Sequence, residues 1–427
     1  MSKYCLSLPS SLLLLIVAFS GRFLLMVDSR TYPGDIEVLK DLKNGLSSRS
    51  VSSGSCLSSW DFSLDPCDNI FGKHFTCGFR CDRVVSGSYR LTEITLDPAG
   101  YSGSLSSTTW SLPYLRTLDV SDNSFSGSIP DSLSNLTRLR RLSLSRNSLS
   151  GHIPESLSSL SELEELYLDN NHIHGPIPSS LNRLGSLKRL EIQRNNLTGE
   201  IPHLGSLRKL FFFDASDNEL SGEVPVTLPS FLVEISVRNN NLEGKLPNNV
   251  GNLRFLQVMD LSQNKLSGPV SSALFDHPSL QQLTLSHNNF KSLEVPGNKG
   301  VNSRLVALDL SYNELGRLLP AFMGSMPELS ALSLEHNKFT GVIPSQYALK
   351  LKAAVPGAGT SSFKRLMLSG NYLLGPIPDA LMGLKPGSVN VSLVDNCLYR
   401  CPDVYFFCQG GDQKSLVDCK SFGPAIP

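Results

Sequence analysis

The sequence has 427 residues, of which 18% are charged, and equal numbers of acidic and basic residues give a formal net charge of zero. Nucleic acids and lipid headgroups favour strongly basic surfaces, so this neutral balance argues against either as the main partner. Length alone would suggest two or three domains. A repeat that runs along most of the chain overrides this expectation, because a repeat array grows along one axis without limit.

Residues 1–29 have the pattern of a secretory signal peptide. A basic start precedes an apolar run at residues 12–19, and small residues lie nearby. This order is typical of a segment that is removed during export, and cleavage after Ser20 or after Ser29 fits it. An uncleaved signal anchor is the alternative, but Arg22 argues against it because it interrupts the apolar stretch.

Residues 30–90 are expected to form an N-terminal cap that contains cysteines. An amphipathic helix is predicted over residues 35–46, with Asp35 as its N-cap. The apolar residues that define its buried face are Ile36, Leu39, Leu42 and Leu46.

Eight cysteines remain when Cys5 in the signal segment is set aside, with four near each end of the chain and none between. They are Cys56, Cys67, Cys77, Cys81, Cys397, Cys401, Cys408 and Cys419. Even numbers of cysteines in an exported protein predict disulfides, and each group of four allows three pairings. Zinc is the alternative for the C-x3-C spacings. An oxidising compartment and the absence of histidine beside the C-terminal group argue against it.

The central stretch repeats one pattern, L-x-x-L-x-L-x-x-N-x-L, and two copies between residues 115 and 160 match position by position at an interval of 24 residues. The asparagine of the pattern recurs at intervals of 22 to 25 residues, apart from one interval of 34. It is found at Asn123, Asn147, Asn171, Asn195, Asn218, Asn240, Asn264, Asn288, Asn313, Asn337, Asn371 and Asn396. A fixed period in this range indicates a solenoid built of leucine-rich repeats.

The first half of each repeat alternates apolar and polar residues, as a strand with one buried face does. One short strand per repeat is therefore predicted. Successive strands would form a parallel sheet in which Leu118, Leu142, Leu166 and Leu190 stack into a continuous core. The asparagine follows at a buried turn, where its carboxamide can both donate to and accept from backbone groups that lack ladder partners.

The second half of the repeat carries G-x-I-P, as at residues 127–130, 151–154, 175–178 and 199–202. Glycine permits a tight return, isoleucine anchors the return leg in the core, and proline stiffens a leg that is expected to have no regular ladder. This continuation resembles the plant-specific class of extracellular leucine-rich repeat, found in plant receptor kinases, receptor-like proteins and polygalacturonase inhibitors. Trp60, which precedes Cys67 and Cys77, is similar to the tryptophan of the N-terminal cap in that class.

The resemblance implies an α/β solenoid. It would be a right-handed leucine-rich-repeat superhelix with a parallel concave β-sheet and disulfide-bonded caps at both ends. A first, degenerate repeat has Ala99 where the asparagine would stand. About 12 to 13 repeats are expected over residues 91–396, followed by a C-terminal cysteine cap and short tail at residues 397–427.

Two segments break the period. Residues 292–300 replace G-x-I-P and are expected to form an irregular convex loop. About ten residues are added within residues 345–362, at a position that resembles the island of some plant receptors. Insertions map to loops, and loops often carry function; an inert longer loop is the alternative.

Three N-x-S/T sequons, at Asn135, Asn196 and Asn390, are predicted glycosylation sites in an exported protein. Asn135 is expected on the convex side. Asn196 directly follows Asn195 of the asparagine series, where burial could block modification.

No catalytic signature is found, and the sequence predicts neither an enzyme nor a cofactor. His172 and His174 flank the core residue Ile173 at an expected turn, so their rings should point to solvent rather than hold a metal. Asp119 and Asp169 fall on neighbouring exposed columns through the repeat period alone, which explains their pairing without acid–base chemistry.

What remains is the concave surface, which a dozen strands spaced ~4.8 Å apart extend to roughly 55 Å. The middle repeats carry large and charged residues there, whereas the end repeats carry mostly small ones. Aromatic and arginine side chains on a rigid sheet are typical of interface hot spots. The predicted ligand-binding residues are Arg141, Arg146, Glu165, Tyr167, Asp169, Arg189, Glu191, Gln193, Arg194, Phe212, Asp214, Glu234 and Arg238, with Phe211 beside them. A solvated face of mixed charge is the alternative.

The resemblance implies a secreted protein of the cell wall space, or apoplast, that binds a peptide or protein ligand in cell-surface signalling, in the manner of receptor-like proteins. A membrane receptor kinase is a further expected partner. No apolar run long enough to span a membrane follows the signal segment. The alternative function is inhibition of cell-wall-degrading enzymes such as polygalacturonase.

Overall fold

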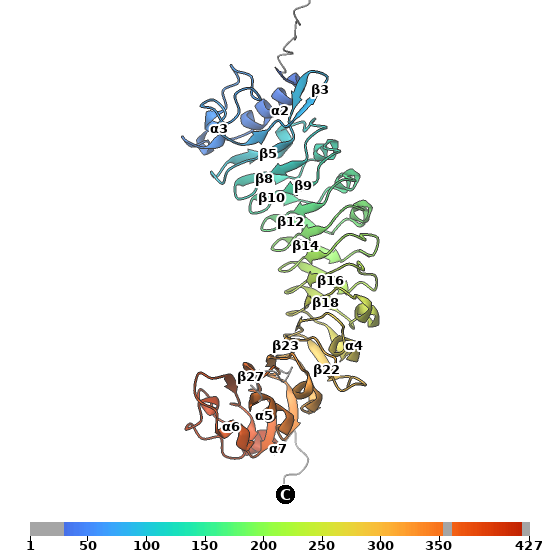
Figure 1. Ribbon diagram of the computed structural model, residues 1–427, viewed down its shortest axis with the longest axis vertical. Helices are drawn as coiled ribbons and strands as arrows, with labels where there is room; N and C mark the ends of the chain where they lie inside the picture. Colours follow the sequence, from blue (N-terminus) through green and yellow to red (C-terminus); the bar gives the residue numbers. More distant parts are fainter. Residues whose placement is uncertain (1–29, 353–360, 421–427) are drawn as a thin grey trace, which may run out of the picture.

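The computed structural model describes residues 30–352 and 361–420. They form an elongated, curved stack of repeats with the first and the last described segments at opposite extremes (Figure 1). The predicted signal peptide and part of the predicted insertion lie outside the described residues.

The largest element is a sheet of 14 strands, here called the concave sheet. Its strands are β2 (Phe79–Arg80), β5 (Glu93–Thr95), β7 (Thr117–Asp119), β9 (Arg141–Ser143), β11 (Glu165–Tyr167), β13 (Arg189–Glu191), β15 (Phe212–Asp214), β17 (Glu234–Ser236), β19 (Val258–Asp260), β21 (Gln282–Thr284), β23 (Ala307–Asp309), β25 (Ala331–Ser333), β27 (Arg365–Met367) and β29 (Asn390–Ser392). All neighbours from β5 onward pair in parallel, and only β2 is antiparallel to its neighbour. The predicted leucine column is confirmed: Leu118, Leu142, Leu166 and Leu190 lie opposite one another and are fully buried.

The return leg also forms strands, which corrects the prediction of one strand per repeat and of a leg without a ladder. Parallel pairing joins them into sheets of seven, two and four strands. The strands are β6 (Ser102–Ser104), β8 (Ser124–Ser128), β10 (Ser148–Gly151), β12 (His172–Gly175), β14 (Asn196–Glu200), β16 (Glu219–Glu223) and β18 (Asn241–Glu243), then β20 (Ser267–Val270) and β22 (Asn289–Leu293), then β24 (Gly316–Leu318), β26 (Lys338–Gly341), β28 (Tyr372–Gly375) and β30 (Cys397–Leu398). In β8 and β10 the strand ends before Pro130 and Pro154, since proline has no N–H to donate to a ladder.

Short helices fill the opposite, convex side (Figure 1). Those between repeats are η2 (Leu105–Ser107), η3 (Asp131–Asn135), η4 (Glu155–Ser159), η5 (Ser179–Arg183), η6 (Asn248–Asn252), α4 (Ser272–Phe275), η7 (Ala321–Ser325), α5 (Ser345–Lys352) and α6 (Asp379–Met382). The end caps add α2 (Pro33–Asn44), η1 (Ser48–Ser50), α3 (Cys56–Ser59), η8 (Phe406–Cys408) and α7 (Leu416–Lys420).

The asparagine column acts as predicted. In Asn147, Oδ1 accepts from the Phe125 N–H at 2.9 Å, while Nδ2 donates to the carbonyls of Val120, Leu144 and Ser145 at 3.0 to 3.2 Å. Equivalent contacts recur in the following repeats. Each carboxamide therefore ties its own turn to the preceding repeat and satisfies buried backbone groups.

The cap helix α2 begins and ends two residues before the predicted range of 35–46. Asp35 was predicted to be the N-cap of this helix, and that prediction is wrong. Tyr32 is the N-cap, and it makes no side-chain capping bond. Asp35 is 1% exposed and forms an ion pair with Arg90, whose Nη2 lies 2.7 Å from its Oδ1. A charge buried this deeply needs such a partner, so the acidic residue ties α2 to β4 (Ser88–Arg90), which with β1 (Arg30–Thr31) and β3 (Arg83–Val85) forms a small sheet.

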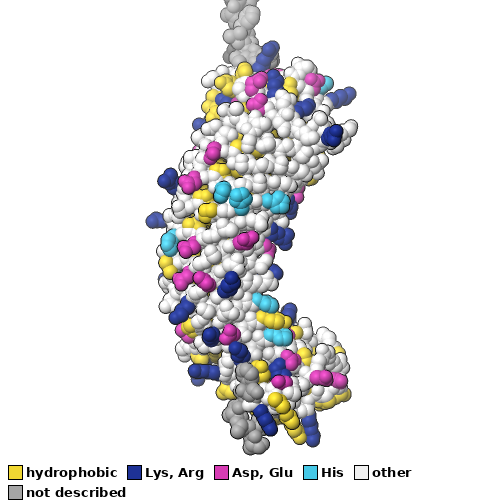
Figure 2. Space-filling model, turned by 180° about the vertical axis from the view of Figure 1, so that it is seen from behind, with side chains coloured by type: hydrophobic (Ala, Val, Ile, Leu, Met, Phe, Trp, Pro, Cys, Tyr) yellow, Lys and Arg dark blue, Asp and Glu magenta, His cyan; other side chains and the backbone are white. Residues whose placement is uncertain are grey.

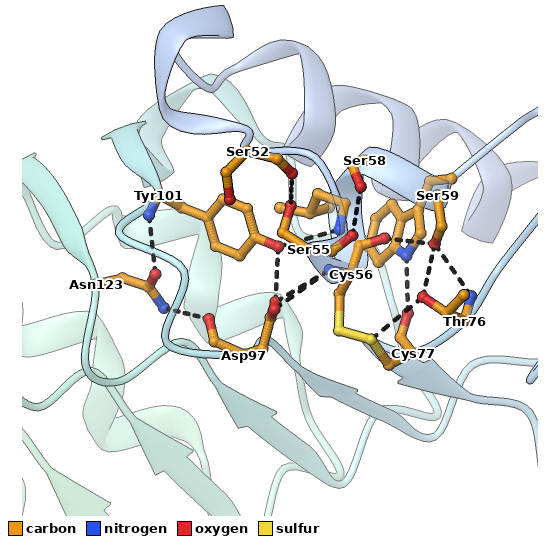
Figure 3. Close-up of a disulfide and its surroundings, with 12 residues drawn as sticks. Ser52, Ser55, Cys56, Ser58, Ser59, Thr76, Cys77, Asp97, Tyr101 and Asn123 are labelled. Carbon is orange, nitrogen blue, oxygen red and sulfur yellow. Dashed lines mark hydrogen bonds between the residues drawn. A yellow bond between two sulfur atoms is a disulfide. The ribbon is translucent and has the colours of Figure 1, made fainter.

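The cap joins the first repeat through a polar network around the disulfide that links Cys56 and Cys77 (Figure 3). The Asp97 carboxylate accepts from the Cys56 N–H at 3.3 Å and from the Tyr101 hydroxyl at 2.6 Å. Asn123 continues the network, because its Oδ1 accepts from the Tyr101 N–H at 2.9 Å. Burial, together with the bond to Asp97, raises the pKa of Tyr101 to about 12. Tyr101 and Asp97 thus connect the asparagine column to the cap in the repeat that lacks its own asparagine.

All eight cysteines form disulfides, as predicted, and the structure shows which of the three possible pairings each group of four adopts. The bonds join Cys56 to Cys77, Cys67 to Cys81, Cys397 to Cys419 and Cys401 to Cys408. Trp60, which the sequence singled out, is buried and donates from its indole nitrogen to the Cys77 carbonyl at 2.9 Å.

The two irregular segments differ. The first was predicted as an irregular loop over residues 292–300. Ser292 and Leu293 instead end β22, and the remaining residues 294–300 contain neither helix nor strand, as predicted. The second begins as the helix α5, whose Tyr347 is fully buried and donates to the Pro320 carbonyl at 3.1 Å. Lys350 is also buried and donates to the Met326 carbonyl at 2.6 Å, and burial lowers its pKa to about 8. This part of the insertion is therefore packed structure, and residues 353–360 lie outside the described part of the chain.

Candidate functional site

The strands of the concave sheet align their outward residues in columns that cross the repeats. Strand pairing places Arg141, Glu165, Arg189, Phe212 and Glu234 side by side in the first column. The next column holds Tyr167, Glu191 and Asp214, at the ends of the same strands. The remaining predicted residues follow the strands: Arg146, Asp169, Gln193, Arg194 and Arg238. The repeat period alone brings all 13 onto one surface.

A groove of about 570 Å³ lies over the middle of this surface. Nine of the predicted residues line it: Arg141, Arg146, Tyr167, Asp169, Glu191, Gln193, Arg194, Asp214 and Arg238. The other four, Glu165, Arg189, Phe212 and Glu234, do not line it. The lining also includes residues that the sequence reasoning missed: Ser121, Ser143, Ser145, Asn170, Ser216, Asp217, Ser236 and Asp260. The repeat period could have identified these missed residues, because they occupy the same columns as the predicted ones. They differ mainly in being smaller or in lying one repeat further along.

Tyr167 is half-buried rather than exposed, because Arg141 covers it. The Arg141 guanidinium carbon lies 4.4 Å from the Tyr167 ring centroid, and its Nη1 lies 2.5 Å from the Glu165 carboxylate. The Tyr167 hydroxyl donates to the same carboxylate at 3.0 Å. Burial, followed by this hydrogen bond, raises the pKa of Tyr167. The three side chains therefore form one fixed cluster at the N-terminal side of the groove.

Phe212 was also predicted to be exposed and is likewise half-buried. The Arg189 guanidinium carbon lies 3.5 Å from its ring centroid, and Nε of Arg189 pairs with Glu191 at 2.5 Å. Gln193 donates to Glu191 at 3.0 Å, but its Oε1 is buried without a hydrogen-bond partner. The groove therefore contains an acceptor that the described residues leave unsatisfied.

Asp169 is the largest departure from the predicted exposure, since only 7% of it is accessible. Its carboxylate accepts from the Ser145 hydroxyl and from Asn170 Nδ2, the latter at 2.7 Å. Asp169 thus forms part of the floor of the groove, and its contacts position neighbouring residues.

Two acidic side chains of the concave sheet, Asp214 in the groove and Glu234 outside its lining, form no ion pair among the described residues. Asp214 accepts only from Ser216, and Glu234 has no ion pair or side-chain hydrogen bond within the described residues. Burial raises the pKa of both carboxyls, and each also feels the charge of Glu191. Arg238 is exposed and forms no ion pair among the described residues. The groove offers charges of both signs that are free to contact a ligand.

Arg146 and Arg194 lie where the backbone is left-handed, at φ values of 52° and 55°. A residue in this conformation precedes most asparagines of the column, including Asp122, Asn170, Asp217 and Asn239. Non-glycine residues adopt it uncommonly, and the sequence reasoning did not find it. The turn projects both arginines from the edge of the groove, where each pairs with an aspartate of a neighbouring repeat.

The repeat fold and the lined groove agree with the comparisons to known proteins. The family description "Leucine-rich repeat region" matches residues 99–367, and a second match, "Leucine Rich Repeat", covers residues 362–384. The chain belongs to the leucine-rich repeat family. Among curated proteins, this leucine-rich repeat protein is similar to Receptor-like protein 34 of Arabidopsis thaliana, at 37% identity over 87 residues.

Solved structures with a similar fold include leucine-rich repeat ectodomains of plant receptors. The protein superposes on the PEPR1–AtPEP1 structure with a TM-score of 0.73 and 31% identity, over 90% of this chain and 51% of that chain. It superposes on the ectodomain of the Arabidopsis thaliana receptor kinase GASSHO1/SCHENGEN3, in complex with CASPARIAN STRIP INTEGRITY FACTOR 2, with a TM-score of 0.65 and 31% identity. That match covers 75% of this chain and 40% of the ectodomain.

The leucine-rich repeat protein spans only part of these relatives. It covers about half of the PEPR1 chain and 9% of the curated receptor-like protein. None of the helices within residues 30–352 and 361–420 is long and apolar enough to cross a membrane.

The three predicted glycosylation sites are all exposed. Asn135 ends η3 on the convex side, Asn196 begins β14, and Asn390 begins β29 of the concave sheet. Burial does not block Asn196, because only its neighbour Asn195 is buried. Use of these sites stays a prediction.

His172 and His174, which were considered as metal ligands, are exposed on β12 and not at a turn. The His174 ring contacts that of His152, with the centroids 4.6 Å apart. Within the described part of the chain, no group of three or more histidine, cysteine, aspartate or glutamate side chains is placed to hold a metal ion. Charged side chains of both signs are spread over the face shown in Figure 2.

Proposed function

We propose that this leucine-rich repeat protein binds a peptide or protein ligand in the concave groove and takes part in cell-surface signalling as a receptor-like protein. The observation that carries the proposal is the groove of about 570 Å³. Its lining combines charged and polar side chains with the ring of Tyr167. Ion pairs with the neighbouring Glu165 and Arg189 hold Arg141 and Glu191 of this lining in place. The proposal assigns the protein recognition and no reaction.

A rigid surface favours this role. The residues that would contact the ligand stand on strands whose pairing and asparagine column are fixed before binding. Little ordering is then needed on association, and less of the contact energy is lost. Fixed aromatic and arginine side chains are the groups that most often dominate such interfaces.

The similar solved structures support an extended ligand. The GASSHO1/SCHENGEN3 ectodomain is solved with CASPARIAN STRIP INTEGRITY FACTOR 2. The HAESA ectodomain, which matches with a TM-score of 0.57 and 27% identity, is solved with the IDA peptide hormone. Signalling through a membrane receptor kinase and location in the apoplast are further parts of the proposal. The four disulfides support an oxidising, extracellular location.

A peptide-display selection on the purified protein tests the proposal. The test variant is Arg194→Glu with Arg238→Glu, because both arginines line the groove and are exposed. Arg365→Glu is the matched control, since Arg365 is exposed on the concave sheet in the C-terminal repeats.

Peptides selected on the wild type should bind the double variant roughly tenfold or more weakly, because contacts to exposed charged side chains are lost and reversed. They should bind the control with unchanged affinity. Equal binding to all three proteins, or a loss only in Arg365→Glu, would place recognition outside the groove.

A further inference from the structure

Three arginines surround a single tyrosine on the N-terminal flank, where the cap meets the first repeats. The guanidinium carbons of Arg83, Arg90 and Arg138 lie 5.2, 4.6 and 4.7 Å from the ring centroid of Tyr114. They come from β3, from β4 and from the segment before β9, while Tyr114 precedes β7. The fold thus brings four separate segments together around one ring.

One of these arginines has a structural role. Arg90 forms two hydrogen bonds with the Asp35 carboxylate, at 2.7 and 3.0 Å, and the Tyr32 ring covers its other side at 4.1 Å. Its side chain is only 9% exposed. The charge of Arg90 is therefore compensated inside the protein, and this ion pair helps to tie α2 to β4.

The other two arginines have no such compensation. Among the described residues, neither Arg83 nor Arg138 forms an ion pair or a side-chain hydrogen bond, and both are half-buried. In the small sheet, Arg83 lies directly opposite Arg90 on the antiparallel neighbour. Like charges placed opposite each other on paired strands are unfavourable.

The three guanidinium groups lie close to one another around the Tyr114 ring. A ring has two faces, so at least two of the three guanidinium groups share one face of Tyr114. Three positive charges therefore stand around this ring with one carboxylate, that of Asp35. Stacking on tyrosine offsets part of the repulsion, and a bound anion would offset the rest.

We propose that Arg83 and Arg138, stacked on Tyr114, form an oxyanion-binding site. The ligand is the carboxylate, sulfate or phosphate group of an acidic molecule, because guanidinium groups present planar forks of N–H donors that match these oxyanions. Neither the two arginines nor Tyr114 lines the concave groove, so the site does not depend on the function proposed above.

Titration of the purified full chain with three probes tests the site: sodium sulfate, sodium phosphate and an octaglutamate peptide. Ionic strength is held constant and low with chloride, because salt screens exposed charges. The test variant is Arg83→Gln with Arg138→Gln. Arg254→Gln is the control, since Arg254 is exposed in a distant repeat and forms no ion pair among the described residues.

The wild type and the control should bind with the same affinity, and the double variant should bind roughly tenfold or more weakly. Binding of sulfate or phosphate identifies a site for free oxyanions, whereas binding of octaglutamate alone identifies one for carboxylates carried on a chain. Either result supports the site. The same affinity in all three proteins, or an equal loss in Arg254→Gln, overturns it.

A second readout separates ligand binding from a structural role. Without added anion, the double variant should keep or raise the melting temperature, because it removes unpaired like charges. A clear drop in melting temperature would mean that Arg83 and Arg138 hold the cap in place, and it would overturn the proposal even if anion binding also fell.

Discussion

The middle and the C-terminal repeats share one scaffold and differ in what they display. In the middle, the first column of the concave sheet carries Arg141, Glu165, Arg189, Phe212 and Glu234. In the C-terminal repeats, the same column carries Gln282, Ala307, Ala331 and Arg365, over a smaller trough of about 210 Å³. Register and asparagine contacts are the same in both regions. The shape of the array therefore comes from the repeated residues, and the proposed recognition would come from the residues that vary.

The convex sides of the two regions differ as well. The middle repeats return through tight turns, some without any helix, whereas the C-terminal repeats carry α4, α5 and α6. The return-leg sheet is continuous from β6 to β18 but breaks before β20 and again before β24. The break before β24 follows the irregular residues 294–305, whereas the longer insertion that begins with α5 leaves β26 and β28 paired. The concave sheet continues past both segments. A solenoid thus tolerates insertion on one side while it holds a binding surface on the other.

The largest expected difference between the regions follows from the disulfides. Reduction should remove about 2–5 kcal/mol of stability for each lost cap bond. The C-terminal repeats next to the Cys397–Cys419 bond should then open before the middle repeats, which contain no cysteine. Hydrogen exchange under reducing conditions measures this order. Earlier exchange in the middle repeats would show that the caps do not hold the array together.

The asparagine column should contribute equally in both regions. Asn171→Ala and Asn313→Ala each remove one accepted and three donated hydrogen bonds from a buried side chain. Each should lower the free energy of unfolding by about 2–4 kcal/mol, because backbone groups are left unsatisfied. Urea unfolding measures both. A much smaller loss at Asn171 would mean that its neighbours replace the column there.

Substitutions on the proposed binding surface should lower ligand affinity in the middle repeats but not in the C-terminal repeats. Tyr167→Ala with Phe212→Ala should weaken binding of a display-selected peptide by about 2 kcal/mol, since these rings and their arginines would form the hot spot. Gln282→Ala with Thr284→Ala, in the C-terminal trough, should have no effect. Isothermal titration calorimetry compares the two. Unchanged affinity in the Tyr167 and Phe212 variant would favour the solvated-face interpretation.

The smallest effect concerns the pH dependence of Asp214. Burial raises its pKa in the folded protein above the ordinary value of 3.8. The unfolded chain therefore releases this proton first, and stability falls as pH rises from 3.8 toward the raised pKa. Asp214→Asn should stabilise the protein at pH 7 by about 0.5–1 kcal/mol, after allowance for solvent screening. It should have no such effect near pH 3. Equal stabilisation at both pH values would mean that charge is not the cause.

Much of this architecture could be predicted from residue spacing. The leucine period predicted the concave sheet, and the asparagine period predicted the column, because both follow from one pattern applied a dozen times. The same period placed all 13 candidate site residues on one surface. It did not predict which would be covered, since the burial of Asp169 and the stacking of Arg189 on Phe212 depend on neighbours one repeat away.

The return leg shows why part of the fold was missed. Its strands span only two to five residues, and the alternation around Leu149 is too short to distinguish from a turn. Pairing with the adjacent repeats stabilises these strands. A prediction made from one repeat at a time does not take that pairing into account. Asp35 was assigned as an N-cap from its position, yet its partner Arg90 lies 55 residues further along the chain. The disulfide pairings depend on the same kind of distant contact.

The most direct test of the central claim is a hydrogen-exchange footprint of a display-selected peptide bound to the wild-type protein. The account predicts slower exchange in segments that contain β9, β11, β13, β15 and β17, with no change at β21, β23, β25 and β27. Protection confined to the C-terminal repeats or to the convex helices would contradict it.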